Sequence, residues 1–241
     1  MAQIRSVTEL ELDSPFLVEG LPGVGLVGGI IADHLGETLG MSYHAAVDCD
    51  GLPQVAVFDE GVHDVQPPVR LLADEGNDLL VLQSDVPVSP KAEGFVDCLM
   101  GWIQEEDVTP LFISGLPTRP EGKPSIFGVS TGDAERLLGD IGAPEQPGVV
   151  SGPTGALLNE ADDRDVDSVG LVVETDPQFP DPAASRVVID EGVAPITGID
   201  VGTDELVEKS EQITEAKKQL AKQMQDAKEE STTATTTGMY G

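Results

Sequence analysis

Three glycines near the N-terminus have the spacing of a phosphate-binding loop. Gly23, Gly25 and Gly28 form the pattern G-x-G-x-x-G, between the apolar run 16–18 and a stretch with helical spacing of apolar residues. Asp48 follows 20 residues after Gly28, at the end of the next predicted strand. In dinucleotide-binding folds such a loop approaches the pyrophosphate and such an acid binds the ribose. One hypothesis is therefore a nucleotide- or phosphometabolite-binding enzyme.

The same glycines also have a purely structural explanation, because glycine permits a tight turn and close packing of a helix on a strand. Pro22 directly precedes the loop, and no Lys or Arg lies between Arg5 and Arg70 to meet a phosphate charge. We therefore favour a structural loop and expect no cofactor and no catalytic residue. The nucleotide-binding enzyme remains the alternative.

The chain ends in a hydrophobic residue, a tyrosine and one final residue: Met239, Tyr240 and Gly241. A terminal carboxylate can pair with a basic group in a pocket. A tyrosine ring can fill a slot while its hydroxyl forms a hydrogen bond, and a methionine adapts to an apolar surface. The tripeptide resembles the tail by which proteasome activators and some assembly chaperones dock on the proteasome α-ring. This resemblance implies that these three residues bind a partner.

Histidines and cysteines do not form a recognisable metal or catalytic set. His34, His44 and His63 lack the spacing of metal ligands, so we expect each in the core or on the surface. Cys49 and Cys98 are too few for a disulfide scaffold, and alone they cannot form a zinc site. We expect no metal.

The chain is strongly acidic, with 44 acids, 13 bases and a formal net charge of −31. This charge excludes a generic nucleic-acid binder and argues against binding to anionic membranes. The acids are spread along the chain, as in proteins of salt-accumulating archaea, where salt screens their repulsion. In such a chain, strand-end acids such as Asp48, Asp50 and Asp85 are expected even without an acid–base function.

Length and hydropathy limit the architecture. A chain of 241 residues can bury one full core, or at most two small ones. No apolar stretch approaches 18 residues, and the N-terminus lacks the pattern of a signal peptide. We expect a cytoplasmic protein.

Short apolar runs alternate with helical patterns. Strands are predicted at 16–18, 43–47, 55–58, 69–72, 79–82, 111–113 and 169–173, and helices at 30–39, 90–106 and 133–138. Ser89 is the predicted N-cap of the second helix, with Pro90 in its first position. The alternation predicts an α/β fold with a mainly parallel sheet flanked by helices. The run 43–82 has no gap of helix length, which allows part of the sheet to be antiparallel.

The character of the sequence changes after Thr203. We expect an α/β domain over 1–202, a C-terminal helix over 203–230 capped by Thr203, and a flexible tail over 231–241. The helix has a thin apolar stripe, which suits either a surface helix on the same subunit or an oligomer contact. The segment STTATTTG at 231–238 would then be a tether for the terminal tripeptide.

The segment 20–28, GLPGVGLVG, resembles the opening segment of the proteasome assembly chaperone family in its archaeal branch. Segments 114–118, 152–159 and 181–185 are similar as well, so the resemblance spans about residues 10–225. It implies an α/β domain related in shape to nucleoside phosphorylases, without a settled catalytic role. It also implies a homo-oligomer whose partners are proteasome α-subunits. We therefore expect a non-enzymatic assembly chaperone or activator-like protein that docks through its C-terminal tail.

Overall fold

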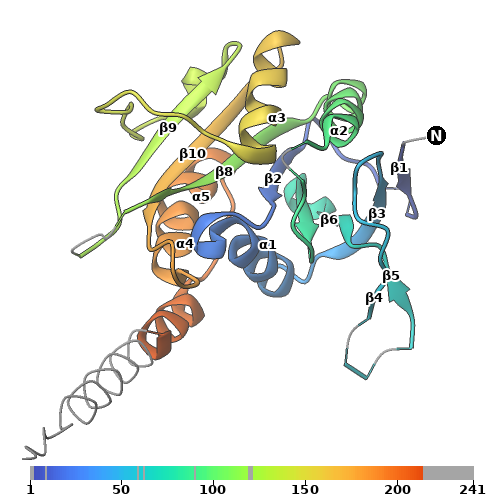
Figure 1. The fold of residues 1–241 in the computed structure, drawn as a ribbon, viewed down its shortest axis with the longest axis horizontal. Coiled ribbons are helices and arrows are strands. Elements are labelled where there is room, and N and C mark those ends of the chain that lie inside the picture. The colour runs from blue at the N-terminus through green and yellow to red at the C-terminus, as the bar shows by residue number, and fades with distance from the viewer. Residues whose placement is uncertain are drawn as a thin grey trace, which may run out of the picture.

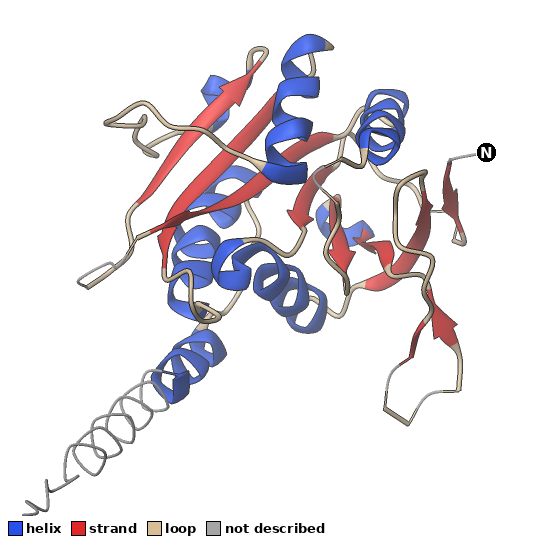
Figure 2. Ribbon diagram, in the orientation of Figure 1, coloured by secondary structure: helices blue, strands red, loops and turns tan. Residues whose placement is uncertain are grey.

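A computed structural model describes residues 3–8, 10–58, 60–61, 63–89, 91–118 and 122–213. Over these residues the chain forms one large sheet with helices on both faces (Figure 1, Figure 2). The terminal tripeptide, and the predicted C-terminal helix beyond residue 213, lie outside the described residues.

The large sheet has eight strands in the order β1-β3-β6-β7-β2-β8-β10-β9. Four neighbouring strands at its centre, β7, β2, β8 and β10, run parallel, whereas β1, β6 and β9 pair antiparallel with their neighbours. The sheet is therefore mixed, with a parallel centre, and the antiparallel part that the run 43–82 allows is present in β3, β6 and β7. The strands are β1 (Gln3–Ser6), β2 (Phe16–Gly20), β3 (Ser42–Asp48), β6 (Val69–Asp74), β7 (Leu79–Ser84), β8 (Thr109–Pro117), β9 (Ile126–Thr131) and β10 (Ser168–Thr175).

Helices cover both faces of this sheet, which makes a three-layer arrangement. The helices α1 and α4 pack against one another on one face, and α2 and α3 do so on the other. The α-helices are α1 (Val27–Thr38), α2 (Glu93–Glu105), α3 (Gly152–Asp163), α4 (Pro182–Val188) and α5 (Ala194–Thr197). Short turns are η1 (Val24–Leu26), η2 (Glu75–Asn77), η3 (Ala134–Leu137) and the π-helical η4 (Ile189–Val193), and a further helix runs over 204–213.

Strand side chains alternate between two hydrophobic cores. On β7, Leu79 and Val81 pack with α1 and α4, whereas Leu80 and Leu82 pack with α2 and α3. Successive side chains of a strand point to opposite faces, so a strand covered on both faces is apolar throughout. This explains why β7 is a continuous apolar run in the sequence.

Two helix boundaries differ from the sequence-based prediction. The helix α2 begins at Glu93 rather than at residue 90, and the hydroxyl of Ser89 accepts from the amide of Lys91 instead of capping it. The predicted helix over 133–138 is a single 3-10 turn, η3. The first correction concerns a helix end, where assignments commonly differ by a few residues, and the second concerns the type of helix.

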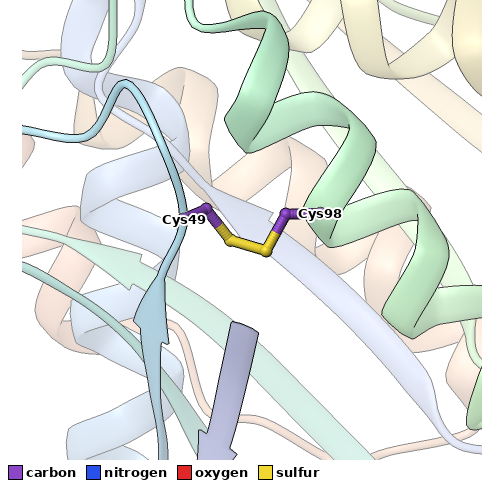
Figure 3. Close-up of a disulfide and its surroundings, with 2 residues drawn as sticks. All are labelled: Cys49 and Cys98. Atoms are coloured by element: carbon purple, nitrogen blue, oxygen red, sulfur yellow. A yellow bond between two sulfur atoms is a disulfide. The ribbon is translucent and has the colours of Figure 1, made fainter. Parts of the chain in front are cut away.

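A small two-stranded sheet and a disulfide lie beside β3. The strands β4 (Val57–Phe58) and β5 (Val65–Gln66) form an antiparallel pair that projects from the body of the molecule (Figure 1). Just before this segment, Cys49 is disulfide-bonded to Cys98 of α2, with 6.0 Å between the Cα atoms (Figure 3). The two cysteines do not build a scaffold, but they form a cross-link that the sequence analysis did not predict.

No helix within the described ranges is long and apolar enough to cross a membrane.

Candidate functional site at the carboxyl edge of the sheet

The glycine loop lies where the parallel strands end. The strand β2 is parallel to β7 on one side and to β8 on the other, and β10 is parallel to β8. The loops after these strands therefore meet at one edge, which we call the carboxyl edge. In open α/β sheets this is the edge where ligands bind.

Two of the three motif glycines are required by the geometry of the loop. Gly25 has a φ of +66°, and a Cβ on it would lie 2.1 Å from the hydroxyl oxygen of Thr175. A Cβ on Gly28 would lie 2.8 Å from the carbonyl oxygen of Leu21. Gly23, by contrast, has an extended backbone, with nothing within 4 Å of an added Cβ. Gly25 and Gly28 thus allow close packing, whereas Gly23 does not need to be a glycine for this reason.

The space next to the loop is filled by the end of β10. Thr175 is fully buried, and its hydroxyl donates to the carboxylate of Asp181 at 3.0 Å. The backbone amide of Asp181 in turn donates to the carbonyl of Gly25 at 2.9 Å. The carboxylate of Asp181 also accepts from the amide of Ala184 at 3.0 Å and so caps α4. This acid fixes the loop to the protein itself.

Asp48 does not join the glycine loop. It lies at the carboxyl end of β3, as predicted, but β6 and β7 separate β3 from β2. Three strand spacings place it roughly 14 Å along the sheet from β2. In a dinucleotide-binding fold the corresponding acid belongs to the strand next to the loop. Gly23, Gly25, Gly28 and Asp48 therefore do not assemble into that kind of site.

A buried carboxyl group that the sequence analysis missed lies at the centre of this edge. Glu19 of β2 is fully buried, and both of its carboxyl oxygens are hydrogen-bonded. One oxygen accepts from the amide of Ile113 at 3.0 Å, and the other from the hydroxyl of Thr154 at 3.1 Å and the amide of Leu21 at 3.3 Å. A single acid thus connects β2, β8 and the first turn of α3.

The position of Glu19 follows from the way β2 leaves the sheet. Strand β2 pairs with β8 only from Phe16 to Val18, so the amide of Ile113 has no strand partner there. A buried amide without a partner would destabilise the fold, and the Glu19 carboxyl supplies the missing acceptor. The one signal in the sequence is an acid inside the otherwise apolar run FLVEG.

Burial raises the pKa of Glu19 from the ordinary 4.5 to about 7. Loss of water favours the neutral acid, and this effect outweighs the hydrogen bonds from Ile113, Thr154 and Leu21, which lower the pKa. A perturbed carboxyl group at such an edge is a typical candidate for function. Here, however, its oxygens face protein donors, so its role in the described structure is to hold three elements together.

The other candidate residues remain apart. His34 is on α1 and its Nε2 lies 2.7 Å from the carbonyl oxygen of Gly202, whereas His44 is on β3, with its Nδ1 3.0 Å from the hydroxyl of Thr8. Asp85 forms an ion pair with Arg70. Among the residues that the structure describes, no group of three or more His, Cys, Asp or Glu side chains is placed to hold a metal.

The start of the C-terminal helix is held firmly against the domain. Leu206 is fully buried, and the carbonyl of Thr203 accepts from its amide at 3.1 Å. The hydroxyl of Thr203 donates to the carboxylate of Asp190 in η4 at 3.0 Å. The predicted docking residues Met239, Tyr240 and Gly241 lie outside the described residues.

Comparisons with known proteins agree with this fold. A family model described as the PAC2 family matches residues 17–221. An uncharacterized protein of Methanocaldococcus jannaschii is 28% identical over 219 residues, which cover 89% of each chain.

Solved structures with low sequence identity share the same fold. The crystal structure of Pyrococcus furiosus PbaA, described as an archaeal homolog of proteasome-assembly chaperone, has a TM-score of 0.75 and 24% identity over 95% of both chains. Pyrococcus furiosus PbaB, described as an archaeal proteasome activator, also has a TM-score of 0.75, with 19% identity over 91% of this chain and 98% of that one.

Proposed function

The chain belongs to the PAC2 family, and from this premise we propose that it is a non-enzymatic proteasome assembly chaperone or activator-like protein. Its partner is the α-ring of the 20S proteasome, and its docking element is the C-terminal tripeptide. The observation that carries the proposal is the combination of the family match with a terminal Met239-Tyr240-Gly241. The fold shared with PbaA and PbaB supports it.

The tail supplies three contacts in this proposal. The terminal carboxylate of Gly241 pairs with a lysine in a pocket between neighbouring α-subunits, Tyr240 anchors in the pocket, and Met239 packs beside it. A single tripeptide binds weakly. A homo-oligomer presents several tails, and multivalency raises the overall avidity by about 10² to 10⁴ when their spacing fits. The acidic composition supports a place in the cytoplasm of a salt-accumulating archaeon.

A change of Tyr240→Ala tests the proposal. We expect it to abolish binding to purified α-rings while the secondary structure and the mass of the oligomer stay as in the wild type. Adding one alanine after Gly241 moves the carboxylate by about 3.5 Å along the chain and should have nearly the same effect. Binding of the Tyr240→Ala variant as tight as that of the wild type in the same salt would refute the tail's role.

The alternative is a nucleotide- or phosphometabolite-binding enzyme that uses the Gly23–Gly28 loop. An α/β domain of the expected nucleoside-phosphorylase-like shape could host such a site, but Thr175 and Asp181 already occupy the inner side of the loop. Thermal shift with ATP, NAD and AMP in high salt discriminates between the two functions. A ligand at 100 times its Kd would stabilise the protein by about 2.7 kcal/mol, and we expect no shift.

A further inference from the structure

An apolar face projects from the molecule on the β4–β5 arm, which we define as the described residues 53–58, 60–61 and 63–68. Phe58 and Val65 are directly opposite one another in the antiparallel pair, so their side chains share one face. Their exposures are 78% and 67%, and Val55 on the same arm is 51% exposed. Large apolar side chains this exposed, on a segment that leaves the body of the domain, are typical of an interaction surface (Figure 1).

The segment that leads into the arm, residues 49–52, is fixed to α2. The disulfide between Cys49 and Cys98 lies just before the arm (Figure 3). Two residues further on, Gly51 packs so closely that an added Cβ would lie 3.2 Å from the Cα of Ala92.

The end of the arm, Pro67 and Pro68, is fixed by the buried Arg70 and its partner Asp85. Nη1 of Arg70 donates to the carbonyl of Pro67 at 3.2 Å and forms an ion pair with Asp85. The amide of Asp85 donates to the carbonyl of Pro68 at 3.0 Å. With both ends of the arm fixed, the apolar face is held in place before a partner arrives, which lowers the entropic cost of binding.

The arm and the C-terminal helix leave the domain at the same edge. The arm follows the carboxyl end of β3, which runs in the same direction as β7 and β2. Helix 204–213 heads toward the β8–β9 turn, because Ser210 and Glu211 line one pocket together with residues 122–124. In Figure 1 both segments point downward from the body of the molecule, the arm at the lower right and helix 204–213 at the lower left. The described start of the C-terminal helix and the arm thus lie at the same edge of the sheet, so one partner bound at this edge can contact both.

The charges of the arm define the partner further. Glu60 and Asp64 are exposed on it, and no Lys or Arg lies between Arg5 and Arg70. A second copy of a chain with a net charge of −31 offers few bases to meet these acids. A foreign surface with basic residues around an apolar groove complements them better.

We propose that the β4–β5 arm is a second docking element, which inserts Phe58 and Val65 into an apolar, basic-rimmed groove on the same α-ring that receives the tail. This inference rests on the proposed function, since it takes the α-ring as the partner. It adds a rigid contact of the domain itself to the contact made by the tail.

The test compares two variants for binding to purified α-rings at one salt concentration. We expect the double variant Phe58→Ser/Val65→Ser to bind about tenfold more weakly than the wild type, the loss typical of removing an exposed apolar anchor. The matched control is Val7→Ser. Val7 is 50% exposed, but it lies beside the amino end of β3, away from the carboxyl edge where the arm begins. Its replacement should therefore leave the affinity for α-rings unchanged.

The possible results separate this inference from the proposed function. If the wild type binds but the double variant binds equally well, the arm proposal is overturned and the proposed function stands. If the double variant instead breaks up the oligomer in sedimentation, the arm is a contact between copies and the proposal is also overturned. A wild-type chain that does not bind α-rings overturns the proposed function, and the arm proposal with it.

Discussion

At the scale of single residues, Glu19 shows how the sheet accommodates a carboxyl group in its interior. The acid completes the hydrogen bonding of the Ile113 amide where β2 departs from β8 and, through Thr154, attaches α3 to the same point. The carboxyl is retained because an apolar side chain at this position would leave the amide unpaired. Burial in turn favours the neutral acid, so this connection depends on pH.

The pH dependence has a definite sign. The pKa of Glu19 is raised from 4.5 to about 7 in the folded protein, so its contribution to stability is complete below about pH 4.5 and is lost as the pH rises to about 7. We expect Glu19→Gln, which is always neutral, to remove this part of the pH dependence. The NH2 group of the glutamine must face either the Ile113 amide or the Leu21 amide and Thr154 hydroxyl, which are all donors, so the variant loses an acceptor. We therefore expect its stability to be lower than that of the wild type at pH 4.5, and this difference to shrink as the pH rises to 8.

Urea unfolding of both proteins between pH 4.5 and 8 measures this difference. Parallel stability curves for wild type and Glu19→Gln would contradict a titration of Glu19 in this range. Ionic strength is held constant throughout, because the net charge of −31 makes stability sensitive to salt as well.

The glycine loop offers a matched pair of substitutions. Gly25→Ala should destabilise the protein by about 3 kcal/mol, because a left-handed backbone and the contact with Thr175 both oppose a Cβ. Gly23→Ala should be nearly neutral, since its backbone is extended and its surroundings are open. Thermal or urea unfolding checks the pair, and equal destabilisation by both changes would show that the structure assigns the wrong role to Gly25.

At the scale of elements, local patterns predict the central strands and α1, but not the pieces that depend on distant contacts. Strand β9 contains Gly128, because a Cβ at this position would lie 2.3 Å from the side chain of Leu138. A glycine inside a strand weakens the strand pattern in the sequence, so this segment was not predicted as a strand. Helix α3 begins with Gly-Pro and contains Gly155, which are turn signals. Its attachment to Glu19 joins residues 135 positions apart, a contact that no local pattern reveals.

Only the local part of the candidate site, the glycine loop, was predicted from the sequence, because the rest depends on contacts between distant segments. The motif Gly23, Gly25 and Gly28 is a local pattern, and its structural interpretation agrees with the packing of Gly25 and Gly28. The separation of Asp48 from the loop depends on strand order, because two strands lie between β2 and β3. Sequence spacing alone cannot distinguish this order from the dinucleotide-binding one.

The disulfide is the strongest single link between two elements. It joins the end of β3 to α2 across a sequence separation of 49 residues. The double variant Cys49→Ser/Cys98→Ser should therefore lose about 3 to 4 kcal/mol of stability, mainly because its unfolded state is less restricted. Urea unfolding of the oxidised wild type, the reduced wild type and the variant checks this. The reduced wild type and the variant both lack the disulfide, so their free energies of unfolding should agree closely. Equal stability of all three would mean that the cross-link adds nothing.

At the scale of the whole molecule, the dominant property is negative charge. With a formal net charge of −31, mutual repulsion destabilises the compact state in dilute buffer. We expect the unfolding midpoint to rise steeply between about 0.1 M and 2 M KCl, as the Debye length falls toward the size of a single contact. A midpoint that does not move would argue against adaptation to high salt and in favour of a basic partner that neutralises the acids.

The attachment of the C-terminal helix to the domain bears on how the terminal tripeptide is presented in the proposed function. The domain holds the base of the C-terminal helix through buried Leu206 and the bond between Thr203 and Asp190. Residues 214–241 then follow, ending in Met239-Tyr240-Gly241. In the proposed function the folded domain determines where each tail starts, and the oligomer determines how many tails reach the ring.

The most direct test of this function is equilibrium binding of purified 20S α-rings to two proteins at the same high salt concentration, the full chain and a chain that ends at Gly238. The proposed function predicts that the shorter chain keeps its fold and oligomeric mass but loses affinity by at least about 10²-fold, since the avidity of all the tails is lost together. Equal affinity of the two proteins for the α-ring would contradict docking through the C-terminal tail.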